Sequence, residues 1–274
     1  MKRLTLTEIQ NLEFEMLKDF HNFCQNNELK YSLAYGTLIG AIRHKDFIPW
    51  DDDIDVVMLR EDYDKFLKLT KEKYLENYEV LSYEYTENYI YPFAKISNTK
   101  TLIHEPTIMK IPLGIYIDIF PLDNIPSELR ELKKLTSKIK ILTKSLIICS
   151  ILWKEVLPII KSKNKKILAN VIRYSISPIF KIYGYKNILK MIFKEINKSK
   201  EIKSEYASNL TGNIIKEKIR KKSFGSLIKS KFRDSEFYIF SNYDEILKNY
   251  YGDYKVIPPV EKRKNHNMKA FLKE

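Results

Sequence analysis

Three aspartates have the type and spacing of a site that transfers a phosphoryl or nucleotidyl group. Asp53 and Asp55 are separated by a single residue in the stretch IPWDDDIDVVM (residues 48–58), and Asp118 lies in the apolar stretch 114–120. Because side chains alternate along a strand, Asp53 and Asp55 would share one face of it. Carboxylate oxygens suit one or two Mg²⁺ (or Mn²⁺) ions, and Asp118 could complete the metal site or accept the proton of an attacking hydroxyl. These three residues are the predicted catalytic and metal-binding set.

The acidic stretch also allows a plainer interpretation. Without a cation it would be a solvated acidic turn, although four like charges between Asp51 and Asp55 repel one another strongly. Asp118 would be a costly unpaired charge in an apolar strand if it had no partner, which favours a function for it. We therefore predict a metal site, in which Asp51 and Asp52 cap or orient the turn and Asp51 supports the metal ligands.

The residues expected to bind a phosphate surround this acidic stretch in the sequence. A turn at Gly36 and Thr37 before a helix would point backbone N–H groups at a phosphate, and glycine has no Cβ to block close approach. Arg43 and Lys95 are the candidate cations for a diphosphate. His44 could contact the phosphate or act as a base, but a hydrogen-bonded structural histidine is an equal alternative.

The segments that must position these residues predict an α+β core. A pair typical of a capping box, Thr7 with Gln10, begins a helix predicted over residues 7–27. The further elements expected are a strand over 31–35 that ends at the Gly36–Thr37 turn, a helix over 38–43, a strand over 54–59, a helix over 61–76, and strands over 78–85, 89–96 and 114–120, the last stopped by Pro121.

Composition predicts three parts in the chain. The α+β core would cover residues 1–125, a basic and mainly helical region 126–233, and a tail over 234–274 would pack back on the core. Helical periodicity extends over residues 126–200, and breaks are predicted at Pro158 and Pro178.

Charge is concentrated in the middle part. The segment from Lys138 to Lys200 has 15 lysines and arginines against two glutamates, while the rest of the chain has 33 basic and 33 acidic residues. The net charge of +13 therefore belongs to this segment alone. Apolar residues next to these lysines predict peripheral contact with an anionic membrane, and they are Leu146, Ile147, Ile148, Ile151, Leu152 and Trp153. The alternative is a set of solvated helices that pack on the core.

The sequence indicates a cytoplasmic protein. No stretch approaches the roughly 18–20 uncharged apolar residues that cross a bilayer, and the first residues do not have the pattern of a signal peptide. Cys24 and Cys149 have no spacing typical of a disulfide framework or a zinc site, which suits a reducing compartment.

Four stretches resemble the LicD family. The most specific is AYGTLIGAIRHKDFIPWDDDIDVVMLREDYDKF (residues 34–66), and the others are FAKISNTKT (93–101), GIYIDIFPLD (114–123) and YGDYKVIPPVEKRKNH (251–266). The resemblance implies a nucleotidyltransferase-like mixed sheet core with flanking helices, into which the basic helical region is inserted. It also implies that the family's Gly-Thr turn falls on Gly36 and Thr37, its Asp-x-Asp pair on Asp53 and Asp55, and its third acidic residue on Asp118.

The resemblance further implies the reaction. LicD-type enzymes move a phospho-alcohol, most often phosphocholine, from a CDP-alcohol donor to a hydroxyl of lipopolysaccharide, teichoic acid or capsule, and they release CMP. The expected partners are a CDP-alcohol and a glycan or lipid-linked glycan, with no nucleic acid. The last matched motif adds four candidate substrate contacts: Tyr251, Asp253, Arg263 and His266.

Two other functions remain open from the residues. A nucleotidyltransferase could use a nucleoside triphosphate at the same aspartates, and the basic region would permit nucleic acid as its acceptor. A peripheral membrane-binding module without catalysis would explain the basic region but has no use for clustered aspartates. Nineteen tyrosines could supply an aromatic cage for a quaternary ammonium, or simply pack in the core.

Overall fold

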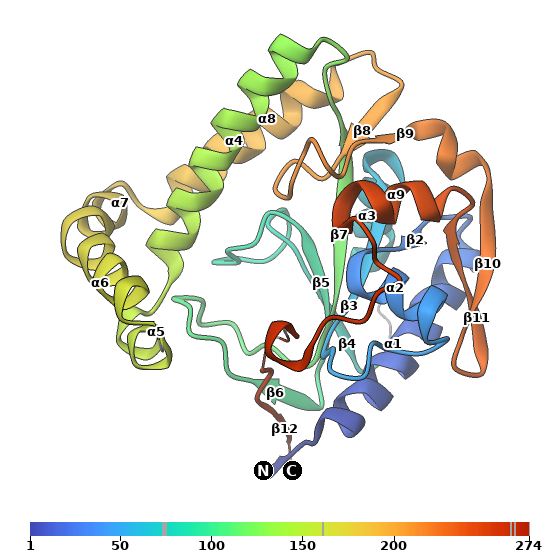
Figure 1. Ribbon diagram of the computed structural model, residues 1–274, viewed down its shortest axis with the longest axis horizontal. Helices are drawn as coiled ribbons and strands as arrows, with labels where there is room; N and C mark the ends of the chain where they lie inside the picture. Colours follow the sequence, from blue (N-terminus) through green and yellow to red (C-terminus); the bar gives the residue numbers. More distant parts are fainter. Residues whose placement is uncertain (73–75, 161, 264, 266, 274) are drawn as a thin grey trace.

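A mixed sheet lies at the centre of the molecule, with helices around it (Figure 1). The computed structural model describes residues 1–72, 76–160, 162–263, 265 and 267–273. The sheet has the order β2–β3–β7–β5–β4, with β8 beside the end of β7 and β9 beside β8; β3 and β7 are parallel and the other pairs antiparallel. The bounds are β2 (Ser32–Leu33), β3 (Ile54–Leu59), β7 (Tyr116–Asn124), β5 (Ala94–Asn98), β4 (Tyr78–Leu81), β8 (Tyr206–Ser208) and β9 (Ile219–Arg220). The predicted α+β class is confirmed.

Helix α1 (Leu6–Asn26) matches the predicted helix to within one residue, but its cap differs. Thr5 is the N-cap, and its capping box is completed by Glu8, whose carboxylate accepts a hydrogen bond from the Thr5 N–H at 2.8 Å. The predicted capping box was wrong because Gln10 points inward, where its Nε2 donates to the carbonyl oxygen of Asp51 at 2.8 Å. Gln10 therefore takes no part in the cap of α1 and instead forms a hydrogen bond with the backbone of the acidic turn.

Helix α2 (Tyr35–Arg43) begins earlier than predicted. The strand before it ends at Leu33, since Ala34 is the N-cap, and the chain turns through the left-handed region at Tyr35, whose φ is 45°. Gly36 and Thr37 therefore lie in the first helical turn, not in a loop before the helix. The positive φ belongs to a tyrosine, and such strained positions are common at functional sites.

Three other strand predictions change in their bounds. The strand predicted over 78–85 ends at Leu81, because the chain turns where the Thr86 N–H donates to the Ser82 carbonyl. The strand predicted over 89–96 is displaced to Ala94–Asn98 by its pairing with β4 and β7. Strand β7 continues through Pro121, which pairs with Met58 of β3. Proline has no backbone N–H, but β5 pairs with β7 only as far as Ile119, so no hydrogen bond to β5 is lost at Pro121.

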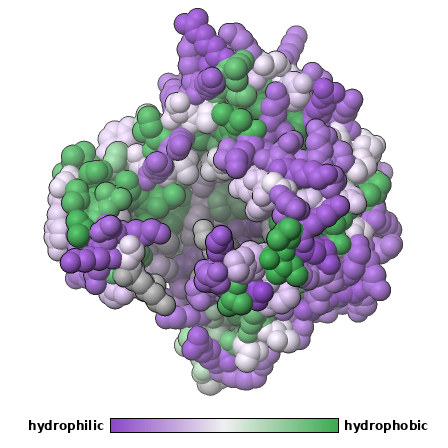
Figure 2. All heavy atoms as spheres, viewed as in Figure 1, coloured by the Kyte–Doolittle hydropathy of each residue, from purple (hydrophilic) through white to green (hydrophobic). Residues whose placement is uncertain are grey.

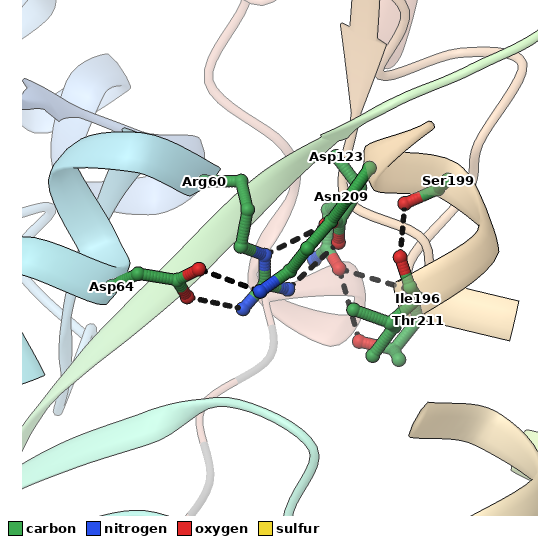
Figure 3. A network of polar contacts seen from close by, with 8 residues as sticks. Arg60, Asp64, Asp123, Ile196, Ser199, Asn209 and Thr211 are labelled. Carbon is green, nitrogen blue, oxygen red and sulfur yellow. Dashed lines mark hydrogen bonds and ion pairs between the residues drawn. The ribbon is translucent and has the colours of Figure 1, made fainter. Parts of the chain in front are cut away.

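A buried ion pair joins helix α3 (Arg60–Glu72) to the end of β7. The Arg60 guanidinium donates to both oxygens of Asp123, at 2.7 and 2.8 Å, and its NH1 lies 3.5 Å from Asp64 (Figure 3). Lys200, the last residue of helix α8 (Tyr185–Lys200), donates to the same Asp64 at 2.6 Å. A bidentate pair of this kind fixes both distance and orientation, so it sets α3 against the strand that carries Asp118.

The region after β7 forms a separate helical arm on one side of the sheet (Figure 1). Its elements are α4 (Leu129–Ser150), α5 (Trp153–Ile159), α6 (Lys163–Val171), the π-helix η1 (Ile172–Ile176), α7 (Ser177–Tyr183) and α8 (Tyr185–Lys200). Helices α4 and α8 pack together around a second apolar cluster, which includes Leu142 and Ile192. Pro158 lies in the last turn of α5, which ends at Ile159, so this predicted break is confirmed. The break predicted at Pro178 was wrong, because Pro178 lies in the first turn of α7, which follows η1 directly, so the chain stays helical from Lys163 to Tyr183. The predicted part boundaries at 125 and 233 stay predictions.

The apolar run predicted to face a membrane is only partly exposed. Leu146 is 5% exposed and Trp153 is 9% exposed, because each packs in an apolar cluster of the arm. Ile147 is 50% exposed, and the others of the run are half-buried. The prediction was therefore wrong for Leu146 and Trp153. Helical packing, and not the local sequence, decides which side of α4 is covered.

The last third of the chain returns to the core and covers the sheet's other edge. Hairpin strands β10 and β11 pack on α2 and β2, and strand β12 pairs with both β1 and β6 near the two termini (Figure 1). The bounds are η2 (Lys221–Gly225), β10 (Leu227–Phe232), β11 (Ser235–Phe240), α9 (Tyr243–Tyr251), η3 (Val260–Lys262), β12 (Ala270–Leu272), β1 (Lys2–Arg3) and β6 (Thr101–Ile103). None of the helices among the described residues combines the length and apolar character needed to cross a bilayer.

Candidate active site

Three charged residues form a row across neighbouring strands. Asp55 on β3 is the register partner of Asp118 on β7, and Asp118 is in turn the partner of Lys95 on β5. Partners in adjacent strands point to the same face of a sheet, so the three side chains line one surface. The parallel pairing of β3 with β7 thus brings together two aspartates that are 63 positions apart in the sequence.

Lys95 is held within this row. Its Nζ donates to Oδ1 of Asp118 at 2.6 Å, and it lies 3.3 Å from the ring centroid of Tyr116 and 4.9 Å from that of Tyr91. Its side chain is only 3% exposed. The prediction of Lys95 as a partner of the diphosphate stays a prediction, and in the structure its immediate partner is a carboxylate.

The acidic turn before β3 holds a tighter group than the predicted set. One carboxylate oxygen each of Asp51, Asp52 and Asp53 lies within 4.8 Å of the others, a spacing that could hold a metal ion. Asp55 and Asp118 lie outside this tight group. An Oδ2 of Asp51 is 2.5 Å from where a Cβ would stand at Gly36, and Asp52 accepts a hydrogen bond from the Met268 N–H at 2.8 Å. Gly36 is therefore needed to make room for the Asp51 carboxylate.

The carboxylates share one electrostatic environment. Burial raises the pKa of Asp55 well above its usual value, and Asp53, Asp118 and Asp51 raise it further while Lys95 opposes them. Burial also raises the pKa of Asp118 to about 6, against the opposing effect of Lys95. The Asp53 charge raises the pKa of both Asp55 and Asp118. The three predicted ligands therefore interact electrostatically, although they are more widely spaced than Asp51, Asp52 and Asp53 are from one another. Such mutual repulsion is what a bound dication would relieve.

Glu13 is a member of this environment that the sequence analysis missed. It is fully buried in α1, and neither of its carboxylate oxygens has a hydrogen-bond partner among the described residues. Burial raises its pKa well above the usual value, followed by the charges of Asp53 and Asp52. The signal was present in the sequence, since Glu13 stands four residues after Ile9 and four before Leu17, on the apolar face of the helix.

Thr37 positions Asp55. Its Oγ1 accepts a hydrogen bond from the Asp55 N–H at 2.9 Å, and its side chain is buried. The hydroxyl is thus engaged with the strand that carries the aspartates. The expectation that N–H groups after Gly36 bind a phosphate stays a prediction, and the helix start at Tyr35 places them in the first turn, where anions are favoured.

Arg43 and His44 connect α2 to the C-terminal segment. The Arg43 NH1 donates to the carbonyl oxygen of Tyr254 at 2.7 Å, and its Nε donates to Nε2 of His44 at 2.9 Å. Burial lowers the pKa of His44, and the Arg43 charge lowers it further. The structure therefore gives both residues a partner within the chain, and a phosphate contact for either stays a prediction.

The candidate substrate contacts of the last motif are separated by the structure. The Arg263 guanidinium lies 4.4 Å from the ring centroid of Trp50, the residue before the acidic turn. Tyr251 is near the aspartates, since Asp55 and Asp51 help to raise its pKa after burial. Asp253 is exposed and accepts a hydrogen bond from the Lys255 N–H at 3.3 Å within its own turn. His266 lies outside the described residues.

The chain is similar to known proteins over the part that carries this site. A family model described as the LicD/FKTN/FKRP nucleotidyltransferase domain matches residues 28–124, which carry the whole row and the acidic turn. The lipopolysaccharide cholinephosphotransferase LicD of Haemophilus influenzae (strain ATCC 51907 / DSM 11121 / KW20 / Rd) is 33% identical over 269 residues, covering 98% of both chains. The chain belongs to the LicD family. Uncharacterized proteins of Rickettsia typhi and Rickettsia prowazekii share only part of it, with 35% identity over 92 residues and 33% over 82 residues, about a third of this chain in each case.

This LicD family chain has an aromatic wall beside Asp55 that the sequence could not locate. The Tyr35 ring lies 5.7 Å from that of Tyr250 and 5.5 Å from that of Phe120, and Tyr250 lies 4.5 Å from Tyr251. Tyr35, Tyr250 and Tyr251 line one pocket together with Glu217. Asp55 helps to raise the pKa of all three tyrosines, which places their rings near the carboxylate row.

Glu217 gives this aromatic wall of the LicD family chain a buried carboxylate. It accepts hydrogen bonds from the Tyr35 hydroxyl and from the Asn213 N–H. Burial raises its pKa, while the hydrogen bonds from Tyr35, Asn213 and Tyr250 oppose that rise. A Cβ at Gly212 would stand 2.4 Å from its Oε1, so this glycine lets the loop close over the carboxylate. Aromatic rings around a carboxylate are a suitable environment for an organic cation.

Proposed function

We propose that this protein is a transferase that moves phosphocholine from CDP-choline to a hydroxyl of lipopolysaccharide and releases CMP. The single observation that carries the proposal is the row of Asp55, Asp118 and Lys95 across three strands, joined by Asp53 of the acidic turn. It is supported by full-length similarity to a relative named as a lipopolysaccharide cholinephosphotransferase. Teichoic acid or capsule as the acceptor would need the same chemistry.

Asp53, Asp55 and Asp118 would hold a Mg²⁺ or Mn²⁺ ion. The residues fit such an ion, because burial and the neighbouring carboxylates raise the pKa of Asp55 and of Asp118, and Lys95 opposes this rise at both. The bound ion would neutralise charge on the donor diphosphate. Asp51 and Asp52 add two more carboxylates within 4.8 Å of that of Asp53, and the buried Glu13 is close enough for their charges to raise its pKa.

The chain's own residues would orient the reaction. The acceptor hydroxyl oxygen bonds to the phosphorus that carries choline, and the bond from that phosphorus to the CMP oxygen breaks. In place of a role as metal ligand, Asp118 would accept the proton of the hydroxyl, for which the rise of its pKa to about 6 by burial suits it near neutral pH. The ion pair to Lys95 holds the Asp118 carboxylate in place, and Thr37 holds the Asp55 backbone.

The choline end of the donor would face the aromatic wall of Tyr35, Tyr250 and Tyr251, with the Glu217 carboxylate beside it. A quaternary ammonium has no N–H to donate, so it is recognised by ring faces and negative charge rather than by hydrogen bonds. Tyr250→Leu should raise KM for CDP-choline about tenfold more than KM for CDP-glycerol, since only the former carries a cation. Tyr250→Phe is the matched control and should retain the preference; equal effects on both donors would argue against the wall as the choline site.

We also infer that the enzyme works in the cytoplasm, on the inner side of a membrane. Both cysteines, Cys24 and Cys149, are free and buried, which suits a reducing compartment.

The reaction is tested by nucleotide release from a panel of CDP-choline, CDP-ethanolamine, CDP-glycerol, CDP-ribitol and nucleoside triphosphates, with a lipopolysaccharide extract as acceptor. CMP from CDP-choline that requires Mg²⁺ and stops with EDTA would support the proposal. Release of CMP from another CDP-alcohol would show that this alcohol, and not choline, is transferred. Release of pyrophosphate from a triphosphate would show that the reaction is nucleotidyl transfer.

A further inference from the structure

The helical arm has an exposed apolar face that the proposed reaction does not use. Between residues 167 and 183, eight large apolar or aromatic side chains are at least 38% exposed, and Ile182 reaches 89%. They are Ile167, Leu168, Val171, Tyr174, Ile176, Ile179, Ile182 and Tyr183. We name this set the arm face. Figure 2 shows apolar residues gathered on the part of the surface where α6 and α7 lie. Clusters of this size on a soluble protein usually mark an interaction site.

The other side of the same helices is anchored. Trp153, Leu157 and Ala169 form a small buried cluster, and the Trp153 Nε1–H donates to Oγ of Ser177 at 3.1 Å. Helix α7 also packs against α4 and α8. Ala169 is the buried residue of α6, so α6 and α7 are fixed by one side only. The arm face is therefore the side that these helices turn away from the protein.

The positive charge around the arm face indicates what kind of partner it binds. Residues 162–194 contain eight lysines and arginines and no aspartate or glutamate. Seven of the eight are exposed, and the other, Arg173, is half-buried; the exposed ones are Lys163, Lys165, Lys166, Lys181, Lys186, Lys190 and Lys194. Interfaces between proteins are depleted in lysine, whereas apolar and tyrosine side chains among lysines are typical of segments that lie in the headgroup layer of an anionic bilayer.

We propose that the arm face docks the enzyme on an anionic lipid bilayer. The apolar side chains enter the headgroup boundary, and the surrounding lysines contact lipid phosphates. The two tyrosines suit the interface, because each has an apolar ring and a polar hydroxyl. This inference does not depend on the proposed reaction, since it concerns only where the protein binds. It also revises the earlier expectation from the sequence, because the eight exposed side chains belong to α6, η1 and α7, whereas Ile147 is the exposed one in the run 146–153.

The test is co-sedimentation of the full chain with vesicles of phosphatidylcholine, alone or mixed with phosphatidylglycerol, at low and high salt. The wild-type chain should bind the anionic vesicles, and more weakly at high salt, because screening removes the lysine contribution. The double variant Ile179→Ser, Ile182→Ser should lose about tenfold or more in binding, since two isoleucines no longer enter the bilayer. The matched control Ile228→Ser changes an equally apolar side chain, 43% exposed, on β10, and should bind as the wild type does.

A second variant keeps the test independent of folding defects. Ile182→Trp should give a blue-shifted tryptophan emission on addition of anionic vesicles, as the ring leaves water. Absence of vesicle binding at both salt concentrations would overturn the proposal, as would equal losses in Ile228→Ser and the double variant. If the double variant instead abolished a dimer seen by light scattering and left vesicle binding unchanged, the arm face would be an interface between copies of this chain.

Discussion

The sheet core and the helical arm of this protein use charge in opposite ways. In the core, Asp55, Asp118 and Lys95 are brought together within three strands, where burial raises the pKa of both aspartates. In the arm, cations are spread over exposed helices, and the stretch 162–194 contains no aspartate or glutamate to balance them. Buried charge needs an exact partner to be tolerated, whereas exposed charge is screened and acts only collectively. Substitutions in the core should therefore change chemistry or stability, and substitutions in the arm should change where the protein binds.

The largest effect on activity is expected in the row of Asp55, Asp118 and Lys95. Asp55→Asn should lower kcat/KM by about a hundredfold or more, because it removes one charged ligand of the proposed metal site. The fold should be retained, since the amide has the same shape and the substitution relieves repulsion from Asp53 and Asp118. CMP release and the far-UV circular dichroism spectrum are the measurements. Asp234→Asn, at the exposed tip of the β10–β11 hairpin, is the matched control; turnover retained by the Asp55 variant would remove Asp55 from the proposed site.

The next effect concerns stability in the core. Asp123→Asn should lower the free energy of unfolding by about 3–5 kcal/mol, because it leaves the Arg60 guanidinium buried without its bidentate carboxylate. Urea denaturation measures the loss. The matched substitution in the arm is Glu131→Gln, whose exposed pair with Lys134 is screened by water and should contribute far less to the free energy of unfolding. Equal losses at the two positions would contradict the distinction between buried and exposed charge.

Metal binding should couple to protonation in the core. Since burial raises the pKa of Asp118 to about 6, this carboxyl takes up a proton as the pH falls through that value and then competes with a cation. Mg²⁺ should therefore raise the melting temperature more at pH 7.5 than at pH 5, and scanning calorimetry measures both shifts. The Asp55→Asn protein should show a smaller shift at pH 7.5. A shift of equal size at both pH values would count against Asp118 as a ligand.

The smallest effect is expected at Glu13. Burial raises the pKa of the Glu13 carboxyl in the folded state. As the pH rises, the unfolded chain therefore loses this proton first, and the folded protein keeps it to a higher pH. Its contribution to the free energy of unfolding is thus most favourable below the unfolded pKa and falls as the pH rises from there through the raised pKa. Glu13→Gln should remove this part of the pH dependence, measured by urea denaturation in the metal-free protein. The exposed neighbour substitution Glu15→Gln should leave the slope unchanged; an unchanged slope in Glu13→Gln would mean that its carboxyl titrates normally.

Local sequence was sufficient for the parts of the site that depend on local periodicity. The strand that carries Asp55, the strand that carries Asp118, the helix that begins near Gly36 and the helical character of the basic region follow from residue types over short windows. The bounds were less certain where a distant partner decides them. Strand β7 passes through Pro121 because β3 supports it, and β5 is displaced because its partners are β4 and β7.

What the sequence determined by itself is the presence of Asp55 and Asp118 on strands, with Asp53 just before the first of them, and the concentration of positive charge in one segment. Only the tertiary structure decided that Lys95 stands opposite Asp118, that Glu13 is buried near the acidic turn, and that the exposed apolar face of the arm belongs to α6 and α7. The physical reason is that strand register and burial depend on contacts between residues far apart in the chain. Periodicity predicts which side of an element is apolar, but the packing of neighbouring elements determines which of those sides is covered.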